Sequence, residues 1–154
     1  MSELGRLLGL DVGEKRLGVA LSDPSQVIAR PFTVVRRGAR VEDFATIGRL
    51  VEEQGVVRIV CGYPLSLDGS EGPQARRVRR YAEALEQALT APVVLWDESY
   101  STVDADRVMQ LTRPRLSPLE RRGWVDAVAA AVILQSYLDA RLAPDPHPPE
   151  IDRP

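Results

Sequence analysis

The sequence predicts an α/β domain with a mixed five-stranded sheet, three antiparallel strands followed by parallel strands, and helices on both faces. Three observations lead to this fold class. The chain opens with three short apolar segments joined by turn residues, and then alternates helical and apolar segments. Its 154 residues, 44% of them apolar, suffice for one hydrophobic core. Alternating helices and strands favour parallel crossovers, whereas strands joined by tight turns pair antiparallel.

The first three segments predict an antiparallel unit. Residues 6–12 (RLLGLDV) and 16–22 (RLGVALS) are apolar strands separated by a tight Gly-Glu-Lys turn, which makes them a hairpin. Residues 26–36 form a third extended segment, interrupted by Pro31. Because proline cannot donate to a sheet ladder, we expect this strand at an edge.

The middle of the chain predicts two helix–strand units. Residues 41–54 have the apolar period of a helix, which Gly55 ends as a cap residue. Residues 56–61 (VVRIVC) read as a buried strand. Residues 73–89 form a helix with arginine-rich and apolar faces, and residues 91–96 (APVVLW) form a further strand.

The C-terminal third predicts two helices and a tail. Residues 102–111 are expected to be helical, residues 113–118 to form a loop, and residues 123–142 to form a long alanine-rich helix, beginning at position 123 or 124. We expect one folded domain over residues 1–142. Residues 143–154 hold five of the 12 prolines and predict a disordered tail.

Composition limits the metal chemistry and the location. One cysteine excludes an intrachain disulfide, and one cysteine with one histidine excludes a Cys/His zinc cluster. Any bound metal is therefore expected to have oxygen ligands, as Mg²⁺ or Mn²⁺ prefers. The N-terminus lacks a secretory signal pattern, and the longest nearly apolar stretch is too short to span a bilayer. We expect a cytoplasmic protein that does not enter membranes.

The basic residues are almost all arginine. The net charge of −2 argues mildly against nucleic-acid binding, but 19 of the 20 basic residues are Arg, the better planar partner for phosphate. A GC-rich coding sequence would explain the same bias. The arginines cluster in three places: Arg36, Arg37 and Arg40; Arg76, Arg77, Arg79 and Arg80; and Arg113, Arg115, Arg121 and Arg122.

Three acidic residues occur in apolar segments or at the end of one, where a carboxylate is unusual. Asp11 lies near the end of a strand that is apolar on both sides, and Glu98 follows the strand at 91–96. Asp126 lies among the apolar residues of the long helix. Buried carboxylates are costly unless a cation neutralises them, and ligands gather beyond the carboxyl ends of parallel strands.

Each acid also has a structural interpretation. Asp11 could begin a turn beside Gly13, and Glu98 could start the next helix. Asp126 could sit in a first helical turn, where the helix dipole favours acids. Together, however, the three could converge if the long helix packs by the two strands, which would make a site for two divalent cations.

Several polar residues are candidates for phosphate contact. They are Lys15, Arg16, Arg76, Arg77, Arg80, Ser101 and Thr102. A solvated turn at Lys15 and Arg16, and helix capping at Ser101 and Thr102, are the simpler interpretations.

The sequence resembles the YqgF/RuvX family of RNase H-like proteins, over residues 7–142. Four blocks in family order carry the resemblance: LDVGEKRLGVALSD at 10–23, VCGYPLSLDGSEGPQARRV at 60–78, LWDESYSTVDAD at 95–106 and VDAVAAAVILQSYL at 125–138. The resemblance implies an RNase H-like fold, a metal site at Asp11, Glu98 and Asp126, and a nuclease acting on structured nucleic acid. Family members are described as pre-16S rRNA nucleases or as Holliday-junction resolvase-like proteins.

One departure from the family pattern is visible. Relatives commonly read Asp-Glu-Arg-Leu-Thr-Thr where this chain reads Asp-Glu-Ser-Tyr-Ser-Thr, so an arginine is replaced by Ser99. This keeps open a non-catalytic nucleic-acid-binding module.

The opening hairpin is also typical of actin-like ATPases and sugar kinases, which need two such subdomains, whereas this chain has room for one. A junction resolvase cuts two strands and would need a homodimer. The sequence leaves open DNA against RNA as substrate.

Overall fold

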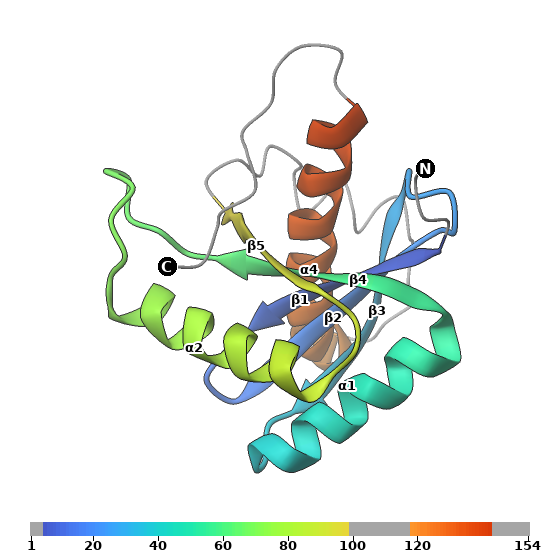
Figure 1. Ribbon diagram of the computed structural model, residues 1–154, viewed down its shortest axis with the longest axis horizontal. Helices are drawn as coiled ribbons and strands as arrows, with labels where there is room; N and C mark the ends of the chain where they lie inside the picture. The colour runs from blue at the N-terminus through green and yellow to red at the C-terminus, as the bar shows by residue number, and fades with distance from the viewer. Residues whose placement is uncertain (1–4, 99–117, 143–154) are drawn as a thin grey trace.

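The computed structural model describes residues 5–98 and 118–142 (Figure 1). Five strands form one sheet in the order β3-β2-β1-β4-β5. β2 pairs antiparallel with β1 and β3, whereas β4 pairs parallel with β1 and β5. The elements are β1 (Arg6–Val12), β2 (Arg16–Ser22), β3 (Ala29–Arg36), α1 (Arg40–Gln54), β4 (Val56–Tyr63), α2 (Pro73–Ala88), β5 (Val93–Asp97) and α4 (Pro118–Leu142). The predicted mixed sheet is confirmed.

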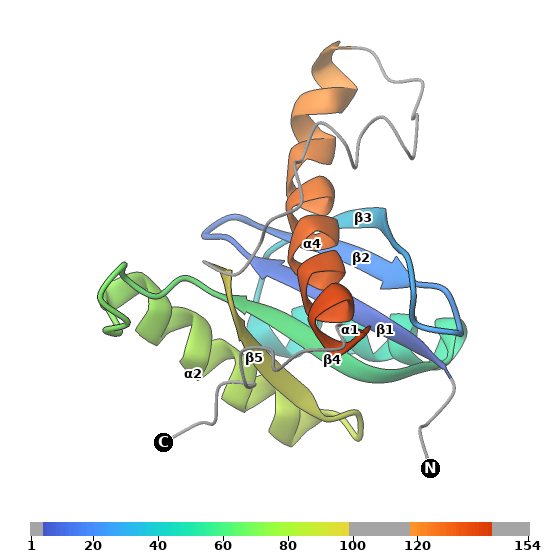
Figure 2. The ribbon, with the colours of Figure 1, turned by 90° about the horizontal axis from the view of Figure 1, so that it is seen from above.

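The helices cover the two faces of the sheet in separate layers. α1 and α2 pack on one face, over a core that includes Leu8, Leu10 and Ile59. Of the helices that the structure describes, α4 is the one that packs on the other face, and Figure 2 shows it crossing the strands of the hairpin. Its core includes Leu7 and Leu134. Because successive strand residues point to opposite faces, Leu8 and Leu10 of β1 face α1 and α2, while Leu7, Gly9 and Asp11 face α4.

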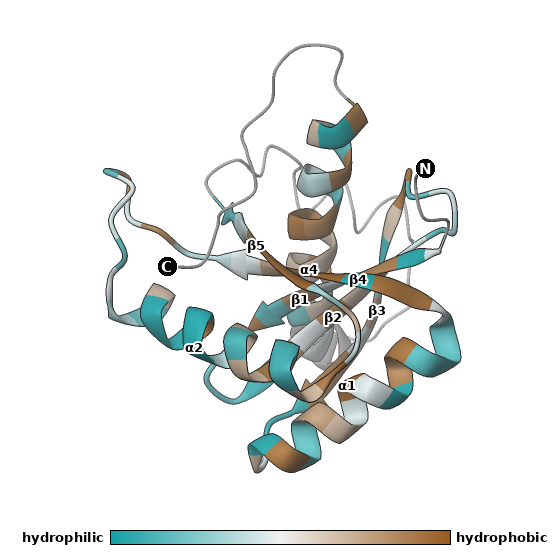
Figure 3. Cartoon of the chain, viewed as in Figure 1, coloured by the Kyte–Doolittle hydropathy of each residue, from teal (hydrophilic) through white to brown (hydrophobic). Residues whose placement is uncertain are grey.

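Hydropathy follows these layers. Figure 3 shows the central strands as largely apolar and α2 as mostly hydrophilic. α2 buries a narrow stripe that includes Val78, Tyr81 and Leu85, and it leaves Arg76, Arg77 and Arg80 exposed. Within residues 5–98 and 118–142, we find no helix with the combination of length and apolar character that a membrane crossing requires.

Most predicted elements are confirmed, with shifted ends. β3 is an edge strand as expected, but it begins at Ala29 instead of residue 26. Asp23 explains the difference, because its carboxylate accepts hydrogen bonds from the backbone amides of Val27 and Ile28 at 2.8 Å and holds them in a turn. Gly55 caps α1 in the left-handed conformation, with φ of 64°, as predicted.

The long helix begins earlier than predicted. α4 starts at Pro118, whereas the sequence suggested residue 123 or 124 after a loop. Proline suits the first position of a helix because its missing amide would be unpaired there in any case. The helix predicted at 102–111 and the tail predicted at 143–154 lie outside the described residues.

Candidate active site

Asp11 lies at the point where α4 crosses the hairpin. It is the register partner of Gly18 on β2. A Cβ added at Gly18 would lie 1.8 Å from the carbonyl oxygen of Asp126, so the backbone of α4 rests directly on this pair of residues. Gly9, two residues earlier on β1, allows the same close approach, since a Cβ there would lie 2.8 Å from the carbonyl oxygen of Ala130. Glycines in the strands therefore bring Asp11 and Asp126 together.

Glu98 reaches the same face from β5. It directly follows this strand, whose Trp96 pairs with Gly62 of β4. A Cβ added at Gly62 would lie 2.7 Å from Oε1 of Glu98 and 2.6 Å from Cδ1 of Ile133. The carboxylate thus lies over the bare backbone of β4, on the side covered by α4. Gly62 comes one residue after Cys61, which pairs with Leu10, so Glu98 and Asp11 flank the same stretch of β4.

The electrostatics show that these carboxylates are crowded. Burial, and then repulsion from Asp126, raises the pKa of Asp11 from 3.8 to about 6. Burial, and then repulsion from Asp11 and Asp97, raises the pKa of Glu98 from 4.5 to about 7. The buried Cys61 thiol also has a raised pKa, mainly through burial, with Asp11 and Glu98 adding to it. Negative charge thus accumulates here.

Asp11 does not behave as a turn residue. Among the side chains of residues 5–98 and 123–142 and the described backbone, no group donates a hydrogen bond to its carboxylate. The hairpin turn closes through the backbone, with the Gly13 amide donating to the Arg16 carbonyl. Asp126 does not belong to a first helical turn either, because α4 begins eight residues before it. The structural interpretations of these two acids are therefore wrong.

Arg16 partly neutralises the negative charge of the three acids, through Asp126. Its Nε donates to Oδ2 of Asp126 at 2.6 Å, and the two side chains are 55% and 26% exposed. An ion pair this exposed contributes at most about 1 kcal/mol, so it can exchange for another partner. Lys15, also predicted to contact phosphate, is exposed in the same turn.

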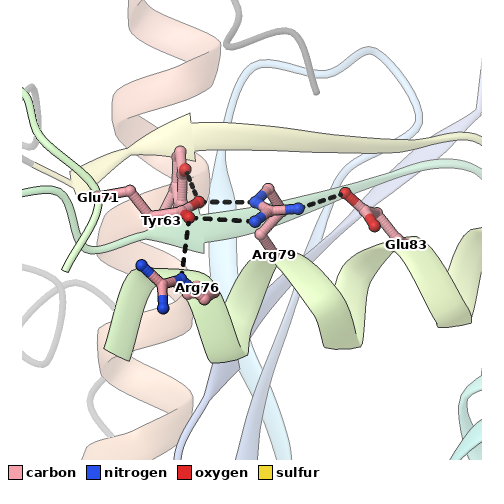
Figure 4. A network of polar contacts seen from close by, with 5 residues as sticks. All are labelled: Tyr63, Glu71, Arg76, Arg79 and Glu83. Atoms are coloured by element: carbon pink, nitrogen blue, oxygen red, sulfur yellow. Dashed lines mark hydrogen bonds and ion pairs between the residues drawn. The ribbon is translucent and has the colours of Figure 1, made fainter. Parts of the chain in front are cut away.

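The three arginines predicted on α2 lie on the other side of the sheet. Arg76 is an ion-pair partner of Glu71, with Nε 3.6 Å from Oε1, in the network drawn in Figure 4. Arg77 and Arg80 are exposed. Because α2 covers the face opposite α4, the structure does not bring these side chains to the three acids. Ser101 and Thr102 lie outside the described residues, as does Ser99.

Sequence reasoning missed the glycines. Gly18 and Gly62 carry no chemistry, yet a side chain at either position would displace α4 or Glu98. The available signal was a glycine inside an apolar strand pattern, which often marks a close approach of another backbone or side chain.

The donor set suits a hard divalent cation. The carboxylates of Asp11 and Glu98 offer oxygen atoms of the kind these cations prefer, and the raised pKa values of both groups reflect a cost of ionisation that a bound Mg²⁺ or Mn²⁺ would offset. Among the described side chains, those of residues 5–98 and 123–142, no three His, Cys, Asp or Glu residues are arranged together to hold a metal ion. In the described structure Asp126 is turned to Arg16 instead, so a third ligand would require that ion pair to open.

Comparison with known proteins identifies the family to which this chain belongs. The family model described as "RuvX: Holliday junction resolvase" matches residues 5–140. The chain belongs to the RuvX family. A relative from Syntrophus aciditrophicus named "Putative pre-16S rRNA nuclease" is 50% identical over 135 residues, which cover 88% of this chain and 89% of the relative. A relative of the same name from Myxococcus xanthus is 44% identical, covering 96% and 97% of the two chains.

Solved structures agree on the fold. Thermus thermophilus RuvC in complex with a Holliday junction substrate matches with a TM-score of 0.58 and 14% identity, covering 90% of this chain and 96% of RuvC. The fowlpox virus resolvase, solved with Holliday junction DNA, matches with a TM-score of 0.57 and 9% identity, covering 90% and 99% of the two chains. The RuvX chain therefore has the RNase H-like fold of these resolvases.

Proposed function

We propose that this RuvX protein is a divalent-metal-dependent nuclease that hydrolyses phosphodiester bonds in structured nucleic acid. Asp11, Glu98 and Asp126 are its metal-binding and catalytic carboxylates. The observation that carries the proposal is the placement of Asp11, which is electrostatically coupled to both other acids at the crossing of α4 over the sheet. The nuclease names of the relatives support it.

The three carboxylates would hold Mg²⁺ or Mn²⁺, as two ions by the prediction from the sequence. Bound cations would supply an activated water and stabilise the leaving oxygen of the phosphodiester. The protein itself supplies position and charge. Asp11 and Glu98 must lose their protons to serve as ligands, which their pKa values allow at and above neutral pH. Arg16 lies where it can leave Asp126 for a substrate phosphate.

For the substrate, we infer the 5′ end of precursor 16S rRNA. The choice of precursor 16S rRNA follows the names of relatives that are 40–50% identical over most of their length, whereas the 5′ end is part of our own proposal. Such a role places the protein in the cytoplasm. Holliday-junction resolution is the second candidate, favoured by the family description and by the likeness to junction resolvases. Resolution would require a homodimer, since two strands must be cut.

A cleavage assay separates these possibilities. The protein is incubated in Mg²⁺ and in Mn²⁺ with a four-way DNA junction, single-stranded DNA and RNA, and a structured 16S precursor. Asp11→Asn keeps the side-chain shape and removes the charge, whereas Asp139→Asn makes the same change at an exposed site on α4. We expect cleavage by wild type and Asp139→Asn but not by Asp11→Asn. Equal cleavage by Asp11→Asn would refute the assignment.

Binding without cleavage in either metal would instead identify a non-catalytic nucleic-acid-binding module. Ser99, which replaces the family arginine, would then be the first position to restore. Stabilisation by a nucleotide, with no nucleic-acid binding, would favour a relative of the actin-like and sugar-kinase group.

A further inference from the structure

A pocket lined by arginines lies on the sheet face opposite α4. A pocket of about 460 Å³ opens between the β1–β2 turn, the start of α1 and the first turns of α2. This volume is within the range of pockets that bind small ligands. Four arginines line it, Arg37 and Arg40 on one wall and Arg77 and Arg80 on the other.

The α2 wall is built by helical spacing. Gln74, Arg77 and Arg80 recur at intervals of three residues, so all three side chains lie along one strip of the helix. Both arginines are exposed, and neither forms an ion pair with a side chain in the described parts of the chain.

The neighbouring arginines of α2 are used differently. Figure 4 shows Arg79 bonded to Glu71 and Glu83, with Nε 2.6 Å from Oε2 of Glu71 and Nη1 3.1 Å from Oε1 of Glu83. The hydrogen bonds that Arg79 and then Tyr63 donate to Glu71 lower the pKa of this carboxyl to about 2. The helix therefore divides its arginines between a structural network and the pocket.

The other wall is held in place by buried groups. Nη1 of Arg37 donates to the carbonyl oxygen of Gly13 at 2.6 Å, and its guanidinium lies 4.7 Å from the ring centre of Tyr81. Asp43 lies behind it, with Oδ2 3.9 Å from Nε of Arg37. Asp43 is only 2% exposed and accepts hydrogen bonds from the Gly38 amide and the Tyr81 hydroxyl, so this support is rigid.

The charge of the pocket is not balanced. The Arg40 guanidinium lies 5.6 Å from the Tyr81 ring centre, so one ring supports two cations. The carboxylate of Asp43 pairs with Arg37 behind the pocket wall, and Glu14 is the acid that lines the pocket itself. The pocket and its supporting wall therefore contain four guanidinium groups and two carboxylates. A pocket with this excess favours an anion with several oxygen acceptors.

We propose that this pocket binds a backbone phosphate of the nucleic-acid substrate, away from the scissile bond. The inference rests on the proposed function, and it adds an anchoring site that the three acids do not provide. Position argues for a nucleic acid over a free phosphate. Val12, Gly13 and Glu14 form part of the pocket, and Asp11 precedes them directly on β1 with its side chain on the other face. A strand anchored here can pass over the end of β1 and present a neighbouring phosphodiester to Asp11.

The test measures binding without cleavage. Fluorescence anisotropy in EDTA follows a labelled four-way DNA junction and a labelled 16S precursor helix over a range of salt concentrations. The double variant Arg77→Gln/Arg80→Gln removes one wall, and Arg40→Gln removes a charge from the other. Arg30→Gln/Arg49→Gln, at exposed positions on β3 and α1, is the control with the same net charge change as the double variant.

We expect the double variant to bind on the order of tenfold more weakly. Its plot of log K against log salt should be less steep by about 2, because two phosphate contacts are lost. Arg40→Gln should also weaken binding, whereas the control double variant should resemble wild type. Melting curves confirm that each variant is folded.

Three results would overturn the proposal. They are equal weakening by both double variants, unchanged binding by Arg77→Gln/Arg80→Gln, and a pocket that binds inorganic phosphate while nucleic-acid affinity does not depend on it. The proposed nuclease is judged separately by cleavage. Loss of binding in the pocket variant of a protein that cleaves nothing would support the pocket and reject the nuclease, and the reverse pattern would do the opposite.

Discussion

Replacing Asp11 by asparagine should stabilise the metal-free protein at alkaline pH. Burial and repulsion raise the pKa of Asp11 from 3.8 to about 6, so the folded protein binds this proton more tightly than the unfolded chain does. The group therefore favours folding below about pH 4, and this contribution is lost as the pH rises through 6. A pKa raised from 3.8 to about 6 corresponds to about 3 kcal/mol of lost stability once the carboxylate is fully ionised.

The asparagine variant lacks this titration. Between pH 5 and pH 8 the wild type should lose about 1.4 kcal/mol that the variant retains, by the linkage relation for a pKa moving from 3.8 to about 6. For a chain of 154 residues this corresponds to about 3–6 °C in Tm. The cost of burying the amide is the same at both pH values, so it cancels in the comparison.

The assay is thermal unfolding in EDTA at pH 5 and pH 8. The Tm of Asp11→Asn minus that of wild type should be larger at pH 8 than at pH 5, while Asp139→Asn should show no such change. A difference that is equal at both pH values, or larger at pH 5, would refute the claim that Asp11 is a crowded, buried carboxylate.

Three further outcomes are expected. In denaturant unfolding, Gly18→Ala should destabilise the protein by at least about 2 kcal/mol, because its Cβ would collide with the Asp126 carbonyl, and it should abolish activity. The control Gly123→Ala, which has open space around its Cβ, should be neutral or stabilising by up to about 1 kcal/mol. Arg16→Gln should change stability by less than about 1 kcal/mol and tighten Mn²⁺ binding in calorimetry, because Asp126 is released; weaker binding would contradict this role. Mn²⁺ affinity should rise on the order of 100-fold from pH 5.5 to 7.5 and level off above pH 8, because Glu98 and Asp11, with pKa values of about 7 and 6, lose their protons over this range. An affinity that does not change with pH would mean that the metal binds elsewhere.

Much of the fold was predictable because the apolar pattern of this chain is regular. The strand at Arg6–Val12 and the strand at Arg16–Ser22 were predicted with their observed bounds. The errors occur where side chains bond locally to the backbone, as Asp23 does before β3, or where a proline starts a helix, as Pro118 does. Neither feature contributes to hydrophobic periodicity.

The places of the candidate acids at strand ends and on the long helix were predictable, but their arrangement in space was not. Asp11 and Glu98 stand at strand ends, which the sequence marks plainly. Their relation to Asp126 depends on how α4 docks, and that is set by a contact between Gly18 and a helix more than a hundred residues later. The pairing of Arg16 with Asp126 spans 110 positions and has no local signal. On α2, the spacing of four residues between Arg79 and Glu83 is a local signal, whereas the pairing of Arg79 with Glu71, which precedes the helix, depends on how the loop before α2 folds.

The most direct test of the central claim is anomalous diffraction from crystals of this protein grown with millimolar Mn²⁺. The account predicts a manganese peak bounded by the carboxylates of Asp11 and Glu98, with Asp126 turned from Arg16 toward the ion. A peak at another place, or none beside Asp11 while Mn²⁺ supports cleavage, would contradict it.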